Sequence, residues 1–87
     1  MPSTYRIYIP KSILKSMAKI PLPWSFRISR AIDSLEFNPY LGDKMSGDMA
    51  PKRKIKIWPY RIMYVVDEKI KLISIKEVEH RGHTSYD

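Results

Sequence analysis

The sequence lacks cysteine, long hydrophobic runs and a balancing number of acidic residues. Without cysteine, neither a disulfide nor a thiolate zinc site can form. No apolar run approaches the ~20 residues needed to span a membrane, and residues 1–10 lack the layout of a signal peptide. We therefore expect a cytoplasmic protein without a membrane partner. Its 87 residues suffice for a single domain, 1–87, with one modest core and no large enclosed cavity.

The shortage of acidic residues makes the chain strongly basic. Sixteen Lys and Arg stand against nine Asp and Glu, which gives a net charge of +7. A surplus of this size in a small domain favours polyanionic partners, either nucleic acid or an acidic protein.

The first half of the chain predicts one strand and two helices. Alternation over Tyr5–Ile9 is typical of a strand, and helical spacing of apolar residues follows over Lys11–Ile20. Lysines at steps of four give this helix a basic face, formed by Lys11, Lys15 and Lys19. Pro23 is suited to the first position of a second helix, whose apolar stripe runs to Leu35. The two helices should form an antiparallel hairpin.

The second half predicts three strands after a loop at Tyr40–Pro51. The β-rich runs are Lys54–Ile57, Tyr60–Val66 and Ile70–Ile75, with a polar, irregular tail from Val78 to Asp87. Their short connections favour an antiparallel meander. The expected fold is α+β, in the order β-α-α-β-β-β, with the helical hairpin packed on one face of an antiparallel sheet.

A cluster of cations is expected on the other sheet face. Because side chains alternate along a strand, Lys54 and Lys56 point away from the helices. An even-numbered turn at Trp58-Pro59, for which we predict a cis bond, places Arg61 opposite Lys56. Like charges that face each other destabilise a sheet unless an anion bridges them, although a solvated basic face remains an alternative.

The remaining reactive groups lie in the tail. Arg81, His83 and Tyr86 follow the last predicted strand closely enough to fold back onto the open face. Tyr86 could equally pack on the edge of the domain. Two histidines without a third ligand do not predict a metal site, and we expect no metal and no cofactor.

These residues together resemble the RelE/ParE toxin superfamily. The resemblance rests on Met45–Met49, Lys54–Ile57, Tyr60–Tyr64 and His80-Arg81 with a trailing Tyr86, and it covers nearly the whole chain in order. It implies a RelE-like toxin of a type II toxin–antitoxin module, an mRNA interferase that cuts messenger RNA in the ribosomal A site without a metal. It also implies a RelB-like antitoxin that forms a hetero-oligomer with the toxin.

By the same resemblance, five positions match the catalytic residues of RelE: Lys54, Lys56, Arg61, Arg81 and Tyr86. Further contacts to RNA are expected from Lys52, Arg53 and His83. The chain departs from the family pattern at Arg53, where an aromatic residue is common, and in the spacing between Arg81 and Tyr86. His83 is an alternative acid or base, because an imidazole titrates near neutral pH.

Two other functions remain open. ParE-like members of the superfamily inhibit DNA gyrase and are not nucleases, but they generally lack the pair Lys54 and Lys56 together with a terminal tyrosine. The other alternative is a catalytically inactive homologue that retains only antitoxin binding.

Overall fold

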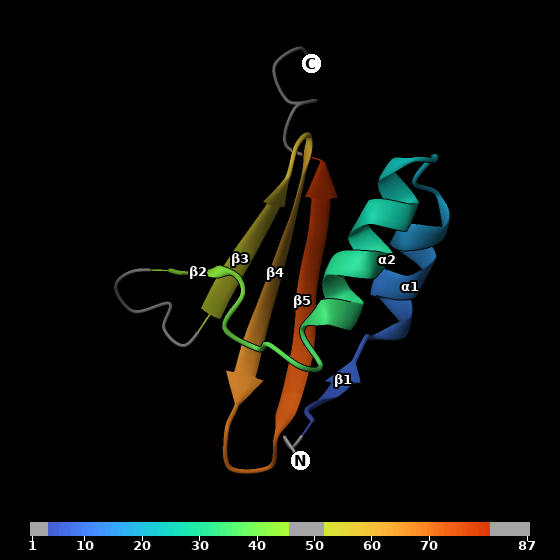
Figure 1. Ribbon diagram of the computed structural model, residues 1–87. Helices are drawn as coiled ribbons and strands as arrows, with labels where there is room; N and C mark the ends of the chain where they lie inside the picture. The colour runs from blue at the N-terminus through green and yellow to red at the C-terminus, as the bar shows by residue number, and fades with distance from the viewer. Residues whose placement is uncertain (1–3, 46–51, 81–87) are drawn as a thin grey trace.

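The computed structural model describes residues 4–45 and 52–80. Its helices and strands are, in order, β1 (Arg6–Tyr8), α1 (Lys11–Ala18), α2 (Trp24–Ser34), β2 (Asp43–Lys44), β3 (Lys52–Ile57), β4 (Tyr60–Asp67) and β5 (Leu72–His80) (Figure 1). The predicted β-α-α-β-β-β order is confirmed. The two-residue β2 is an addition inside the segment that we expected to be a loop.

The strands form one sheet in the order β1-β5-β4-β3-β2. Strands β3, β4 and β5 form the predicted antiparallel meander, and β2 pairs antiparallel with β3. Strand β1 pairs in parallel with β5, so the sheet is mixed rather than wholly antiparallel as expected. The helical hairpin separates β1 from the meander, so no tight turn dictates the direction of β1.

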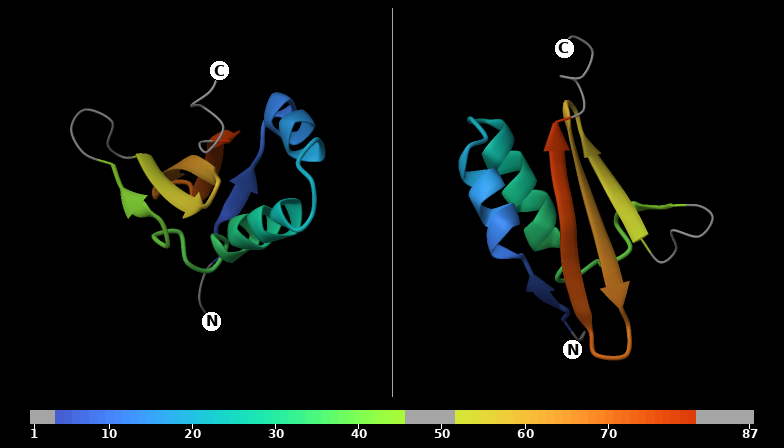
Figure 2. Two further views of the ribbon diagram at one scale, coloured as in Figure 1. Left: turned by 90° about the horizontal axis from the view of Figure 1, so that it is seen from above. Right: turned by 180° about the vertical axis from the view of Figure 1, so that it is seen from behind.

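Both helices pack on the same face of the sheet, and no other described element covers the opposite face (Figures 1 and 2). The core between the two layers is apolar and comes from α2 with its C-cap residue, β4 and β5. Its buried members are Ile28, Ile32, Leu35, Ile62, Tyr64, Val66, Ile73 and Ile75. We call the uncovered side of the sheet the open face.

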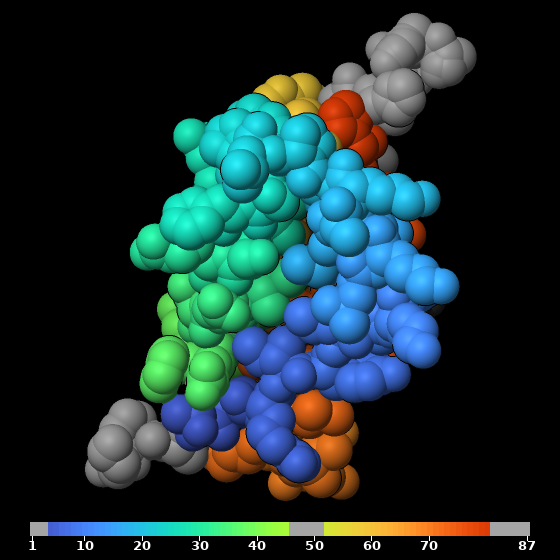
Figure 3. Space-filling view, turned by 90° about the vertical axis from the view of Figure 1, so that its right-hand side faces the viewer, coloured from blue at the N-terminus to red at the C-terminus, as the bar shows by residue number. Residues whose placement is uncertain are grey.

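The two helices differ in how deeply they are buried. Helix α2 buries Ile28 and Ile32, as its apolar stripe predicts, whereas α1 has no fully buried residue. The lysine face of α1 is exposed as expected, and Figure 3 shows α1 and α2 side by side on the outer surface. Helix α1 is therefore a peripheral layer, attached mainly through Ile13 and Met17.

Prolines set the ends of both helices. Helix α1 stops at Ala18 rather than Ile20, because Pro21 disfavours the helical conformation in the residue before it. Pro23 is the N-cap of α2 rather than its first residue, and the Leu22–Pro23 bond is cis.

Strand β5 is longer than predicted. It begins at Leu72, after a turn in which Lys71 has a φ of 54°, and it continues to His80. Its register against β4 shifts between Met63 and Tyr64, which leaves Lys76 as an extra residue in β5. This β-bulge interrupts the alternation, and so the sequence pattern ends at Ile75 although the strand does not.

Candidate functional site

The open face gathers the cations that the sequence places there. Lys54 pairs with Met63, and Lys56 pairs with Arg61. Directly opposite residues of an antiparallel pair lie on the same face. Their neighbours Ile62 and Tyr64 are buried on the helix side, so the predicted facing is confirmed.

The turn that sets this register also has the predicted form. Residues Trp58 and Pro59 connect β3 and β4, and the bond between them is cis. Because the connection contains two residues, Arg61 comes to lie beside Lys56 rather than on the opposite face.

A hollow of about 280 Å³ lies at this end of the β3–β4 hairpin. It is lined by Lys54, Lys56, Trp58, Tyr60 and Arg61. Three cationic and two aromatic residues therefore line one open depression. Such a depression can accept a phosphate group together with an adjoining base.

A carboxylate that the sequence reasoning missed also belongs to this site. Arg61 Nη2 donates a hydrogen bond to Glu79 Oε2 at 2.7 Å, and the two side chains are 20% and 31% exposed. Arg61 Nε is buried and has no hydrogen-bond partner among the described residues. Glu79 faces Arg61 and Glu77 faces Met63, so both glutamates lie on the open face of β5.

The bulge explains why Glu79 was missed. Without the extra Lys76, the alternation that turns Ile73 and Ile75 inward would also turn Glu77 and Glu79 inward. The available signal was Val78, an apolar residue out of phase with Ile73 and Ile75, which indicates a phase change in the strand.

Arg53, from which we expected a contact to RNA, lies away from the cation cluster. It pairs with Tyr64 and so lies on the side away from Lys54. Its Nη1 donates to the carbonyl of Gly42 at 2.7 Å, and its guanidinium carbon lies 4.8 Å from the centre of the Tyr40 ring. Because side chains alternate, the neighbouring Lys52 lies on the open face, whereas Arg53 does not.

Tyr64 fastens the segment before β2 to the sheet. Its side chain is fully buried, and its hydroxyl donates to the Pro39 carbonyl and accepts from the Gly42 N–H, both at 2.9 Å. Burial raises the pKa of the Tyr64 phenol, so the neutral form is favoured. A Cβ on Gly42 would lie 2.5 Å from the Lys54 carbonyl oxygen, which explains a glycine at this close approach.

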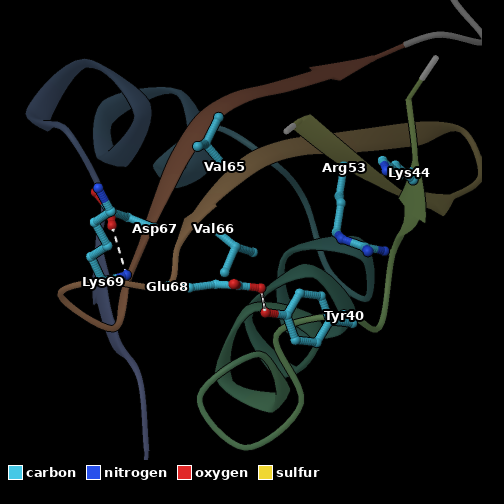
Figure 4. A pocket seen from close by; sticks show the side chains of 8 residues that line it. All are labelled: Tyr40, Lys44, Arg53, Val65, Val66, Asp67, Glu68 and Lys69. Carbon is cyan, nitrogen blue, oxygen red and sulfur yellow. Dashed lines mark hydrogen bonds between the residues drawn. The ribbon is translucent and has the colours of Figure 1, made fainter. Parts of the chain in front are cut away.

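A second depression, of about 600 Å³, lies near the β4–β5 turn (Figure 4). Its lining mixes both charges: Lys69 lies beside Asp67 and Glu68 near the turn, whereas Lys44 and Arg53 lie on the other side of the depression. The Tyr40 hydroxyl bonds to Glu68, and this bond raises the pKa of the Tyr40 phenol. The mixed charge distinguishes this depression from the cationic hollow on the open face.

The predicted site residues of the tail, Arg81, His83 and Tyr86, lie outside the described residues. The described chain ends at His80, which pairs with Tyr60 and meets that ring edge to face at 4.8 Å between centroids. Tyr60 in turn lines the hollow, so the last described residue of β5 contacts a residue of the site. Within residues 4–45 and 52–80, no three His, Asp or Glu side chains come together as a metal site.

No helix in the described part of the chain is long and apolar enough to cross a membrane. No protein-family model and no curated protein matches the sequence.

Solved structures do match. The isolated RelE toxin of Escherichia coli aligns with a TM-score of 0.80 and 19% identity, over 93% of this chain and 88% of that one. A chain of the RelE–RelB complex of Pyrococcus horikoshii aligns with a TM-score of 0.73 and 27% identity, over 93% of this chain and 99% of that one. A chain of the RelBE2 complex of Mycobacterium tuberculosis gives 0.76 and 19%, over 93% and 95%. The chain therefore has the fold of the RelE toxins, and the resemblance first seen in its sequence is confirmed by structure.

Proposed function

We propose that this chain is the toxin of a type II toxin–antitoxin module and a ribosome-dependent endoribonuclease that cleaves mRNA in the A site. The observation that carries the proposal is the gathering of Lys54, Lys56 and Arg61 around one hollow on the open face. The RelE-like fold supports it. The proposed substrate places the protein in the cytoplasm.

RNA cleavage of this kind proceeds by internal attack. A base removes the proton of the 2′-hydroxyl, the 2′-oxygen bonds to phosphorus, and the bond from phosphorus to the 5′-oxygen breaks. The products are a 2′,3′-cyclic phosphate and a 5′-hydroxyl, whose proton comes from an acid or from water. The protein must neutralise the extra charge on the phosphate oxygens as the transition state forms.

The cations of the hollow suit these tasks. The planar guanidinium of Arg61 can hold two phosphate oxygens at once. Lys54 or Lys56 can serve as the base, or can stabilise the phosphate charge from the neighbouring strand. The three groups approach from two strands of a rigid hairpin, which fixes their relative positions.

The tail supplies the remaining proposed roles. Arg81 follows the end of β5 in sequence and is proposed to add charge stabilisation. Tyr86 is proposed to stack on a splayed base, as aromatic residues do in single-stranded RNA recognition. His83 is the alternative acid or base.

We further propose a RelB-like antitoxin as partner. The similar structures from Pyrococcus horikoshii and Mycobacterium tuberculosis are toxin–antitoxin complexes. A net charge of +7 and an uncovered cationic face favour an acidic or amphipathic segment that wraps the toxin.

The test is cleavage of mRNA on purified translating ribosomes, with the cut mapped by primer extension. We expect a cut within the A-site codon, strong loss of that cut in Arg61→Ala, and suppression by antitoxin. A parallel gyrase supercoiling assay covers the ParE-like alternative. Inhibition of gyrase without mRNA cleavage would contradict the proposal, as would growth arrest that Arg61→Ala and Arg81→Ala leave unchanged.

A further inference from the structure

A third depression borders the hollow, between α2 and β3. We call it the α2 groove; its volume is about 550 Å³. Helix α2 contributes Phe26, Arg27 and Arg30 to its lining, and the β3 side contributes Lys56 and Trp58. None of its described lining residues is acidic.

The α2 groove adjoins the hollow on the open face. Lys56 and Trp58 line both depressions, so they form a shared ridge. On the other side of Arg61, the sheet carries Glu79. The cationic surface therefore continues from Arg61 past Lys56 toward α2, whereas toward β5 it meets a carboxylate.

The groove exposes flat aromatic and guanidinium surfaces. Phe26 and Trp58 are 56% and 73% exposed. The guanidinium carbon of Arg30 lies 5.5 Å from the centre of the Phe26 ring, which is a cation–π distance. In the described part of the chain, neither Arg27 nor Arg30 forms an ion pair with a carboxylate. Their charges remain available to an anionic ligand.

We propose that the α2 groove binds single-stranded RNA next to the phosphate held by Arg61; this inference rests on the proposed function. Exposed rings beside unpaired cations are the features that hold bases and backbone of single-stranded RNA. An amphipathic protein helix would instead require a mainly aliphatic groove, and here only Ala31 and Ile57 are aliphatic. The shared ridge lets one RNA strand occupy both depressions.

The experiment measures binding of fluorescent 2′-O-methyl oligouridines, which cannot undergo internal attack, to the full chain. Two lengths are compared, a nonamer and a trimer. The double variant Arg27→Ala/Arg30→Ala should weaken binding of the nonamer about tenfold and leave the affinity for the trimer within about twofold of that of the parent protein. It should also make the slope of log affinity against log salt concentration less steep by about 1.4, because two phosphate contacts are lost. Phe26→Leu should weaken the nonamer about fivefold or more, since it removes a stacking surface.

The matched control is Lys11→Ala/Lys15→Ala, which removes the same charge from exposed positions on α1 and should have little effect. Equal weakening by both double variants would overturn the inference, because general charge would then explain binding. Tighter binding of a nonaglutamate peptide than of RNA, lost in Arg27→Ala/Arg30→Ala, would also overturn it in favour of a protein ligand.

The outcome is separable from that of the proposed function. If ribosomal mRNA is not cleaved but binding of the nonamer depends on Arg27 and Arg30, the nuclease proposal fails and the inference that the α2 groove binds RNA holds. If mRNA is cleaved but the nonamer is insensitive to both arginines, the inference about the groove fails alone.

Discussion

At the scale of single residues, Arg61 lies between charges of opposite sign. On one side it pairs with Lys56 of β3. On the other side it pairs with Glu79 of β5, which lies at ion-pair distance. The alternation in Lys54–Ile57 is enough to predict the cations, because it needs only the period of a strand. The carboxylate could not be predicted in the same way, because a bulge changes the phase of β5 before Glu79 is reached.

This pairing makes Glu79 a competitor of the substrate phosphate. We predict that Glu79→Gln tightens binding of non-cleavable RNA by about two- to tenfold, because Arg61 is released for the phosphate. The free energy of unfolding should change by less than about 1 kcal/mol, since the pair is partly exposed and screened by solvent. Fluorescence anisotropy and urea unfolding check the two effects.

The control for this prediction is Glu77→Gln. It removes the same charge from the same strand and face, but faces Met63 rather than Arg61. Equal tightening of RNA binding in the two variants would show that the lower negative charge of the face, rather than the release of Arg61, causes the effect. Weaker binding in Glu79→Gln alone would show that Glu79 orients Arg61 for the substrate instead of competing for it.

At the scale of elements, the sequence predicts what local patterns determine. The helix positions, the β3–β4 register and the cis Trp58–Pro59 bond follow from periodicity and proline placement. The direction of β1 and the pairing of β2 depend on distant partners and leave no local pattern. The side of the sheet on which Arg53 lies follows from strand alternation, because it pairs with the inward-facing Tyr64.

Strand β4 and the segment before β2 are joined through one buried hydroxyl. We predict that Tyr64→Phe lowers the free energy of unfolding by about 1–3 kcal/mol, because the Gly42 N–H and the Pro39 carbonyl lose their partner. Urea unfolding monitored by circular dichroism measures the loss. Tyr8→Phe, at a 55% exposed tyrosine, should change stability by less than about 0.5 kcal/mol. Similar values for the two variants would contradict a structural role of the Tyr64 hydroxyl.

At the scale of the whole molecule, positive charge occupies several surfaces of the described chain, two of which adjoin. One is the exposed lysine face of α1, another is the α2 groove, and a third is the hollow on the open face. The net charge of +7 predicts an anionic partner but does not identify the surface that binds it. Among the described residues, the hollow is the surface where three cations come from two paired strands, and the chain that carries it has the fold of a RelE toxin.

The most direct test compares the cleavage rate of ribosome-bound mRNA in two triple variants. Lys54→Ala/Lys56→Ala/Arg61→Ala removes three charges from the hollow, and Lys11→Ala/Lys15→Ala/Lys19→Ala removes three from the helical face. If the hollow holds the scissile phosphate, the first variant should lose at least about 1,000-fold in single-turnover rate, while the second stays within about tenfold of the parent. Equal losses in the two variants, or an unchanged rate in the first, would contradict the account.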